Sequence, residues 1–266
     1  MTHLPKLLLS LSFITAAFGS VSAQTAASSP HEMLPDAPQP EAAQEVTLKG
    51  TPLAILHDQK AIWTSPAHIR TGDLKWLAPL AVATGVAIAT DHHVMGSVVS
   101  HDASFNNANV NASNVLVGGL IAAPVAIFGI GQWKEDSHAR ETGILAGEAI
   151  LDGVVVEQGM KLIFWRERPS MDNARGLFFQ GRAGTDSGFP SSHSVLAWSS
   201  AAVIAEEYPS RWTQLGVYSL ATGVSLTRVL GQQHFPTDAL VGSAAGWLVG
   251  HYVYKSHHRL THRTRN

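Results

Sequence analysis

The chain has 266 residues, enough for an export signal and one domain of about 200 residues. Hydrophobic residues make up 45% of it and charged residues only 14%, whereas about 25% is typical of a soluble domain. The formal net charge of −2 gives no indication of nucleic acid as a partner, and the absence of cysteine excludes disulfides.

Residues 1–23 have the pattern of an export signal peptide. Lys6 supplies the positive charge, residues 7–18 are mostly apolar, and Val21-Ser22-Ala23 is a small-x-small cleavage site. We therefore expect an exported protein of the periplasm or cell envelope. An uncleaved membrane anchor is the alternative.

The next segment, residues 24–50, is rich in Ala, Pro, Gln, Glu and Ser and lacks periodic apolar positions. This composition predicts a disordered linker. A helical domain is expected over residues 51–266, and it ends in a basic tail over about residues 255–266.

Six apolar segments follow the linker, and their lengths favour helices over strands. They are residues 74–90, 114–132, 142–165, 194–206, 214–228 and 238–254. Glycine and alanine are frequent, and long β-branched alternation is missing. The sequence therefore predicts an all-α fold, a bundle of about six helices with the active site at one end. The asparagine-rich stretch Phe105–Asn114 is predicted to be a loop.

Lys161, Arg168 and Pro169 form the first of three polar clusters. Arginine presents planar pairs of donors that match phosphate oxygens, and lysine adds a point charge. Because seven residues are about two helical turns, both cations are predicted to share one face of a helix. Pro169 would stop that helix and leave Arg168 at its accessible end.

The second cluster is Pro190-Ser191-Ser192-His193, directly before an apolar run. A serine here can cap the helix, and the free N–H groups of the first helical turn bind anions. His193 is predicted to lie at the edge of that anion site.

Thr227, Arg228, His234 and Asp238 make up the third cluster. Pro236 fits the first position of a helix, which brings Asp238 close enough to accept a hydrogen bond from His234. Such a carboxylate fixes the tautomer of the imidazole and leaves its other nitrogen free to attack. Because a loop histidine contributes little to a core, replacing His234 by alanine is predicted to abolish turnover without affecting folding.

In this order and spacing, the clusters resemble the signature of the type 2 phosphatidic acid phosphatase and vanadium haloperoxidase superfamily. Its pattern is Lys-x6-Arg-Pro, then Pro-Ser-Gly-His, then Ser-Arg-x5-His-x3-Asp. Ser192 stands where the family usually has glycine, and Thr227 where it usually has serine. Threonine keeps the hydroxyl. Ser192 would cost about 1 kcal/mol if its backbone needed a positive φ.

The resemblance implies a metal-independent phosphatase and a role for each residue. His234 would form a phosphohistidine, Asp238 would orient it, and His193 would protonate the leaving group and later activate water. The phosphoryl oxygens would be held by Lys161, Arg168, Ser191, Ser192 and Arg228. No cofactor is implied, and vanadate would act as an inhibitor or, as a weaker alternative, as a cofactor.

The implied substrate is a phosphate monoester or pyrophosphate. Export to a site near a membrane favours a lipid phosphate, such as phosphatidic acid or a polyprenyl pyrophosphate. A broad-specificity exported acid phosphatase is the near alternative. Two other classes stay open: a vanadate-dependent haloperoxidase, and a non-catalytic envelope protein that binds phosphate or lipid, which Ser192 favours. The sequence does not indicate an oligomeric state.

Whether the helices cross a membrane is left open by the sequence. A span needs about 20 apolar residues, and only residues 115–131 approach that without a charge. Glu148, Asp152 and Glu157 would be costly in lipid. Five spans, with residues 74–90 outside the bilayer, would place the basic tail inside. We favour an exported bundle, peripheral or partly embedded, over that arrangement.

Histidine-containing segments outside the three clusters carry weaker predictions. Asp91-His92-His93 and His101-Asp102 are interpreted as polar loop residues rather than as a metal site. His257, His258 and His262 are interpreted as part of a solvated tail.

Overall fold

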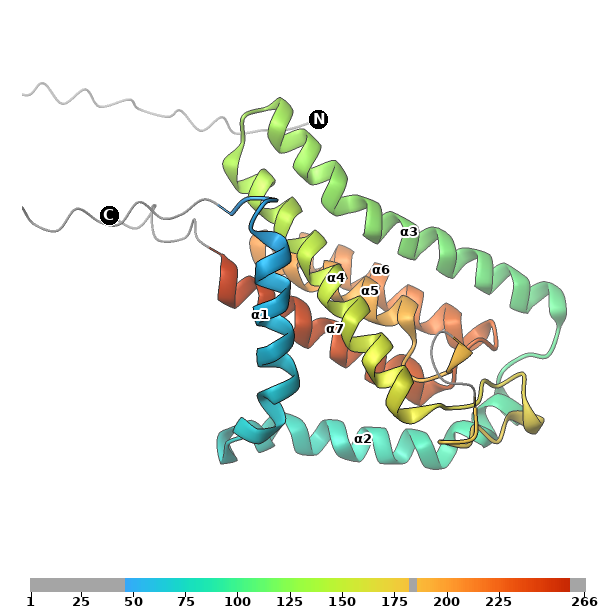
Figure 1. Cartoon of the computed structure of the whole chain (residues 1–266). Coiled ribbons are helices and arrows are strands. Elements are labelled where there is room, and N and C mark those ends of the chain that lie inside the picture. The colour runs from blue at the N-terminus through green and yellow to red at the C-terminus, as the bar shows by residue number, and fades with distance from the viewer. Residues whose placement is uncertain (1–45, 182–185, 259–266) are drawn as a thin grey trace, which may run out of the picture. The chain divides into compact units, whose positions relative to one another are not determined.

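The computed structural model describes residues 46–181 and 186–258. Within these ranges there are seven α-helices and no strand (Figure 1), which confirms the all-α class. The helices are α1 (Thr51–Thr64), α2 (Leu74–His93), α3 (Ala103–Trp133), α4 (Ser137–Phe164), α5 (Ser192–Glu207), α6 (Arg211–Leu230) and α7 (Pro236–His257). Each of the six predicted segments is a helix. The predicted export signal and most of the predicted linker lie outside the described residues.

Helix α5 lies at the centre of the bundle, where it packs against α3, α4, α6 and α7. Alanine and serine dominate its buried positions, and such small side chains let neighbouring helices approach closely. The main apolar core lies between α4, α5 and α7 around Leu145, Val203 and Val249. The C-terminal ends of α4 and α6 therefore meet the N-terminal ends of α5 and α7, and these four ends carry the three clusters.

Three glycines of α7, four residues apart, form a stripe that faces α5. A Cβ atom on Gly242 would lie 2.8 Å from the carbonyl oxygen of Ser191, and one on Gly250 would lie 2.5 Å from that of Ser199. A Cβ atom on Gly246 would collide with the carbonyl oxygen of Val195. Only glycine therefore allows the two backbones to meet at this separation, and the seam fixes the start of α5 against α7.

Two elements differ from the sequence prediction. The stretch Phe105–Asn114 belongs to α3 and is not a loop, because Asp102 caps the helix by accepting a hydrogen bond from the N–H of Phe105 at 2.8 Å. Packing of α3 on α4 and α6 outweighs the low helix propensity of asparagine. Helix α1 was not predicted, since it lacks an apolar stripe and its one buried residue is Asp58.

Two helical segments among the described residues are long and apolar enough to cross a membrane, judged by length and composition alone. They are Thr71–Val98, which contains α2, and Ala103–Trp133, which is α3. The first includes residues 74–90, which the five-span arrangement places outside the bilayer. In α4, by contrast, Glu148, Asp152 and Glu157 are buried inside the bundle.

Candidate active site

The first cluster is not continuous with a helix, contrary to prediction. Helix α4 ends at Phe164, because Trp165 adopts the left-handed conformation with φ 38°. Arg168 and Pro169 therefore follow in an irregular segment, and Lys161 and Arg168 do not share a helix face. The Arg168 guanidinium is held by two carbonyl oxygens, that of Asp186 at 3.2 Å from Nε and that of Gln233 at 3.3 Å from Nη1.

Lys161 is buried at the end of α4 and joins two polar partners. Its Nζ donates a hydrogen bond of 2.7 Å to Ser192 Oγ and lies 3.4 Å from Glu157 Oε2. Burial lowers the pKa of Lys161; the Glu157 carboxylate opposes this shift, and the Arg168 charge adds to it. The charges of Arg168 and Lys161 thus interact within one site. They do so although Arg168 follows α4 in an irregular segment and does not share a helix face with Lys161.

Ser191 and Ser192 open α5 and differ in their side-chain contacts. The Ser191 hydroxyl is fully buried and has no hydrogen-bond partner among the described residues. An unpaired buried hydroxyl is costly, so the Ser191 hydroxyl is well suited to donate a hydrogen bond to an oxygen of a ligand. Ser192 is helical and is not among the residues with positive φ, so the condition under which serine would carry a backbone cost is not met. Its hydroxyl instead donates to Glu157 Oε2 at 3.1 Å.

His193 occupies the first turn of α5 and contacts a residue that sequence reasoning missed. Its Nε2 lies 2.9 Å from Oδ1 of Asn114 on α3. An amide oxygen only accepts, so Nε2 carries the proton and Nδ1 is the nitrogen left for proton transfer. Burial, followed by the charge of Arg228 and those of the other site cations, lowers the pKa of His193 to about 4.

Arg228 is buried near the end of α6 and retains an unsatisfied donor. Its Nη1 donates to Ser113 Oγ at 3.3 Å, while its Nε has no hydrogen-bond partner among the described residues. Burial and the Arg168 charge lower its pKa to about 10. Thr227, one residue earlier, points its hydroxyl to its own helix, where the carbonyl oxygen of Gly223 accepts at 2.6 Å.

His234 is almost completely buried, so the view of it as a loop histidine with little part in the core is wrong. Its Nδ1 donates to the carbonyl oxygen of Gly188 at 2.8 Å and lies 3.7 Å from Oδ2 of Asp238. The second distance is too long for a hydrogen bond. Gly188 therefore fixes the tautomer, which leaves Nε2 unprotonated. Burial lowers the pKa of His234, and Asp238 opposes that shift.

Asp238 is held by a buried arginine that sequence reasoning also missed. Arg166 donates from Nη1 to Asp238 Oδ1 and from Nη2 to Asp91 Oδ2, each at 2.6 Å. Its guanidinium carbon lies 4.3 Å from the ring centre of Phe235 and 4.5 Å from that of Phe178. Asp238 also accepts from the backbone N–H of Phe235 at 2.8 Å. Arg166 thus holds the carboxylate of Asp238, and that carboxylate caps the start of α7.

The remaining histidine-containing segments are ordered by contacts within the fold. Asp91 belongs to α2 and pairs with Arg166, so it is not a loop residue. His92 lies 3.1 Å from the carbonyl oxygen of Ala174. His257 and His258 lie against buried carboxylates, which contradicts the prediction of a solvated tail. His262 lies outside the described residues.

Taken together, three cations, two histidines and two unsatisfied buried donors meet where four helix ends converge. The charge of Arg168 reaches Lys161, His193, Arg228 and His234. A site with this excess of positive charge and free donors suits a phosphoryl group, and unprotonated Nε2 of His234 supplies a nucleophile. No carboxylate–histidine set in this pocket has the arrangement of a metal site, as far as the described residues extend.

Comparison with known proteins agrees with this geometry. A model of the PAP2 superfamily matches residues 142–262. The chain is 26% identical over 186 residues to lipid A 1-phosphatase of Porphyromonas gingivalis, and 28% identical over 125 residues to lipid A 4′-phosphatase of the same organism. These matches cover 68% and 44% of this chain. They cover only 38% and 52% of the two relatives, so the chain spans about half of their length or less.

Among solved structures, the chain is similar to the first transmembrane PAP2 type phosphatidylglycerolphosphate phosphatase from Bacillus subtilis. The two are 18% identical, with a TM-score of 0.48, and the match covers 82% of this chain and 98% of the other. The family match spans all three clusters, from Lys161 to Asp238. The resemblance inferred from the motifs is thereby confirmed: the part of the chain that carries them, residues 142–262, matches the PAP2 superfamily.

Proposed function

We propose that this protein is a metal-independent lipid phosphatase that works through a phosphohistidine on His234. The observation that carries the proposal is that one site contains both a nucleophile and free donors. The nucleophile is the unprotonated Nε2 of His234, and the unsatisfied buried donors are on Ser191 and Arg228. A phosphoryl group satisfies these donors and balances the charge of the surrounding cations.

In the first step, His234 Nε2 attacks phosphorus and the bond between phosphorus and the leaving oxygen breaks. The leaving oxygen takes its proton from His193, which must therefore be protonated in the complex. The pKa of His193 is about 4 without substrate, and a bound phosphate dianion raises it by opposing the cations that lower it. Substrate binding thus promotes the protonation of His193, which then acts as the acid.

In the second step, water attacks phosphorus of the phosphohistidine and the phosphorus–nitrogen bond breaks. His193, now neutral, accepts the proton of that water, and inorganic phosphate leaves. Asn114 positions the imidazole through Nε2 in both steps, so proton transfer runs through Nδ1. Lys161, Arg168 and Arg228 stabilise the charge on the phosphoryl oxygens throughout.

An apolar groove beside the site supports a lipid substrate. It has a volume of about 1210 Å³ and lies between α2, α6 and α7. Its lining includes Val229, next to Arg228, and Ala239, next to Asp238, together with Trp76, Leu80 and Trp247. Such a surface suits acyl chains attached to a phosphate held in the adjacent pocket. The two relatives named above are lipid A phosphatases, which is the same class of substrate.

Two observations bear on the alternatives. Ser192 lacks the strained backbone that favoured a non-catalytic phosphate binder, and its hydroxyl bonds with Lys161 and Glu157. The apolar groove favours a lipid over the soluble substrates of a broad-specificity acid phosphatase. A membrane-associated protein of the cell envelope fits both the groove and the apolar segments around α2 and α3.

The test is phosphate release by the purified full chain in detergent, with and without EDTA. Substrates are lipid A, phosphatidic acid, a polyprenyl pyrophosphate and para-nitrophenyl phosphate. His234→Asn replaces the buried imidazole by an amide that still donates to Gly188, and its turnover is expected to fall at least about 1,000-fold. His68→Gln, which removes an exposed histidine between α1 and α2, is the control and should stay active.

EDTA-resistant release from a lipid that is lost only in His234→Asn would support the proposal. Release from para-nitrophenyl phosphate alone would favour the acid phosphatase, and halide oxidation by the vanadate-loaded protein with peroxide would favour the haloperoxidase. A folded protein that binds phosphate and releases none from any substrate would be the non-catalytic binder.

A further inference from the structure

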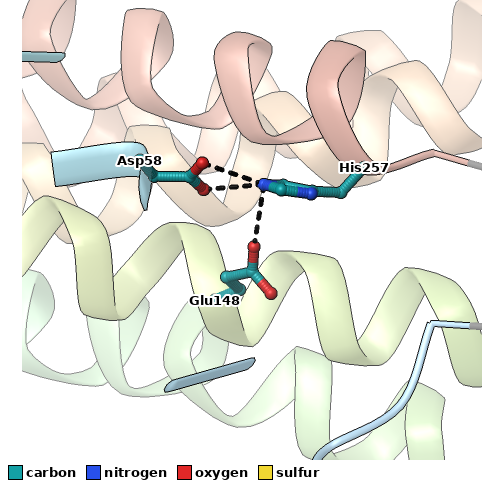
Figure 2. Close-up of side chains that lie close together, drawn as sticks. All are labelled: Asp58, Glu148 and His257. Atoms are coloured by element: carbon teal, nitrogen blue, oxygen red, sulfur yellow. Dashed lines mark hydrogen bonds and ion pairs between the residues drawn. The ribbon is translucent and has the colours of Figure 1, made fainter. Parts of the chain in front are cut away.

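Far from the phosphate pocket, one histidine and three carboxylates meet between α1, α4 and α7. Figure 2 shows Nε2 of His257 directed at both Asp58 and Glu148. It lies 2.9 Å from each Asp58 oxygen and 3.4 Å from Glu148 Oε1. Asp152 is four residues after Glu148 and so lies on the same face of α4. Asp58, Glu148 and Asp152 are 1%, 2% and 0% exposed, so this charge is removed from water.

The cluster contains more acid than the protein balances. The imidazole of His257 contacts Asp58 and Glu148, and Asp152 lies one turn further along α4. No salt bridge joins a lysine or arginine to any of the three carboxylates within residues 46–181 and 186–258. Gln59 donates to Asp152 Oδ1 at 2.7 Å, which is a neutral partner. Buried carboxylates without a compensating cation are strongly destabilising. The arrangement therefore calls for additional positive charge.

Two oxygens of the cluster also lack a hydrogen bond. Glu148 Oε1 and Asp152 Oδ2 are buried and have no hydrogen-bond partner among the described residues. The 3.4 Å separation from His257 Nε2 shows that Glu148 Oε1 points into the cluster. Such orphaned acceptors are rare in folded proteins. A cation bound beside Glu148 would satisfy its oxygen directly and would reduce the negative charge near Asp152.

We propose that Asp58, Glu148 and His257 form a binding site for a divalent transition-metal ion, with Zn²⁺ as the best match. Their ligand atoms all lie within 4.8 Å of one another. Ligands about 2.0–2.2 Å from a tetrahedral Zn²⁺ are separated by roughly 3.3–3.6 Å. The distances from His257 Nε2 to Asp58 and Glu148, 2.9 Å and 3.4 Å, are close to this. A mixed set of imidazole and carboxylate suits Zn²⁺, and Mn²⁺ is the next candidate.

The site would fasten α1 to the bundle. Asp58 is the only buried residue of α1, and this helix packs mainly on α4. A metal ion shared by α1, α4 and α7 would join three segments distant in sequence. Glu148 is about 20 Å from Lys161 along α4, at 1.5 Å per residue, so this structural ion is separate from phosphoryl transfer.

A second group, Glu141, Glu207 and His258, offers a matched control. Its ligand atoms also lie within 4.8 Å of one another. Both oxygens of Glu207 are already engaged, one with His138 at 2.8 Å and the other with His258 at 2.9 Å. That group therefore has less need of an ion than the Asp58 cluster has.

The test is Zn²⁺ binding by the full chain after removal of any purification tag and treatment with a chelator. Bound metal is counted by mass spectrometry, and thermal unfolding is followed with Zn²⁺, with Mn²⁺ and with EDTA. We expect about one tightly bound Zn²⁺ per chain and a higher unfolding temperature with the metal than with EDTA. Asp58→Asn and Glu148→Gln should each lose the ion, whereas Glu207→Gln should keep it.

Asp58→Asn changes a single residue of a peripheral helix, and circular dichroism verifies that the bundle remains folded. The proposal fails if wild-type protein binds neither Zn²⁺ nor Mn²⁺ at micromolar concentration. It also fails if Asp58→Asn retains the ion or if Glu207→Gln alone loses it. Phosphate release below the unfolding temperature should be the same with and without EDTA, which separates this site from the proposed catalytic activity.

Discussion

Helices α4 and α7 each connect two polar regions of opposite character. At one end, arginine and lysine surround His193 and His234, and the pKa of His193 falls to about 4. At the other end, carboxylates surround His257 and His258. There burial, with help from neighbouring acids, raises the pKa of Glu148 to about 7 and that of Glu207 to about 8. Histidine thus serves as a neutral base at the cation-rich end and as a partner for carboxylates at the carboxylate-rich end.

The difference between the regions follows from what each lacks. The cation-rich end has unsatisfied donors, on Ser191 and Arg228, and so suits an anion. The carboxylate-rich end has unsatisfied acceptors, on Glu148 and Asp152, and so suits a cation. The unsatisfied donors at one end and the unsatisfied acceptors at the other support the two ligands proposed above, an anion and a cation.

The largest expected effect is on the free energy of unfolding. It comes from removing Arg166, which lies at the cation-rich end but pairs with buried carboxylates of the fold. Arg166→Ala leaves Asp91 and Asp238 buried without a partner, which should destabilise the fold by about 3–5 kcal/mol. Chemical denaturation measures this. Arg175→Ala, which removes an exposed pair with Asp172, should cost less than about 1 kcal/mol. Equal effects of the two substitutions would mean that the Arg166 pairs contribute little.

Arg168 lies two residues from Arg166 but is assigned to the phosphate. Arg168→Ala should lower kcat/KM about 100- to 1,000-fold while changing the free energy of unfolding by less than about 1 kcal/mol. The comparison with Arg166→Ala in both assays separates the two roles. Loss of folding without a specific loss of activity would place Arg168 with the structural residues.

The two regions should also differ in how pH affects ligand binding. A dianion at the cation-rich end raises the pKa of His193 from about 4, so binding takes up a proton. Sulfate does not titrate near neutrality, and its affinity should rise as pH falls from 7 towards 5, by up to about tenfold per pH unit. Calorimetry should find this dependence lost in His193→Asn and kept in His234→Asn. A slope that survives in His193→Asn would identify another proton acceptor.

The smallest effect is expected at Thr227, although it belongs to the third motif. Its hydroxyl bonds to the carbonyl oxygens of Gly223 and Val224 within α6 and not to the pocket. Thr227→Val should therefore change kcat/KM by less than about threefold, since only an intrahelical hydrogen bond is lost. A loss comparable to that of Arg168→Ala would show that the hydroxyl reaches the phosphate during turnover.

Local sequence patterns were sufficient for the six long helices and for the three motifs that meet at one end of the bundle. They were not sufficient for residues whose partners are distant in sequence. Arg166 is separated from Asp238 by 72 positions and from Asp91 by 75, and His193 is separated from Asn114 by 79. No local periodicity indicates such pairs.

Helix α1 shows a second limit of sequence reasoning. Apolar periodicity finds helices that bury apolar side chains, but α1 buries a carboxylate, Asp58. The role of Gly188 was equally hidden, because its carbonyl oxygen, not a side chain, accepts the hydrogen bond from His234. Side-chain motifs cannot report a contact that any residue type could make.

The glycine seam between α5 and α7 restricts which side chains this contact between the two helices can accept. Where two backbones touch, no side chain remains to be exchanged, and every added carbon at Gly242 or Gly246 meets a carbonyl oxygen of α5. The seam joins Ser191 and Asp238 through a hydrogen bond of 3.0 Å between their backbones. The starts of α5 and α7 thus form one unit, and a substitution at the seam would displace Ser191 and Asp238 together.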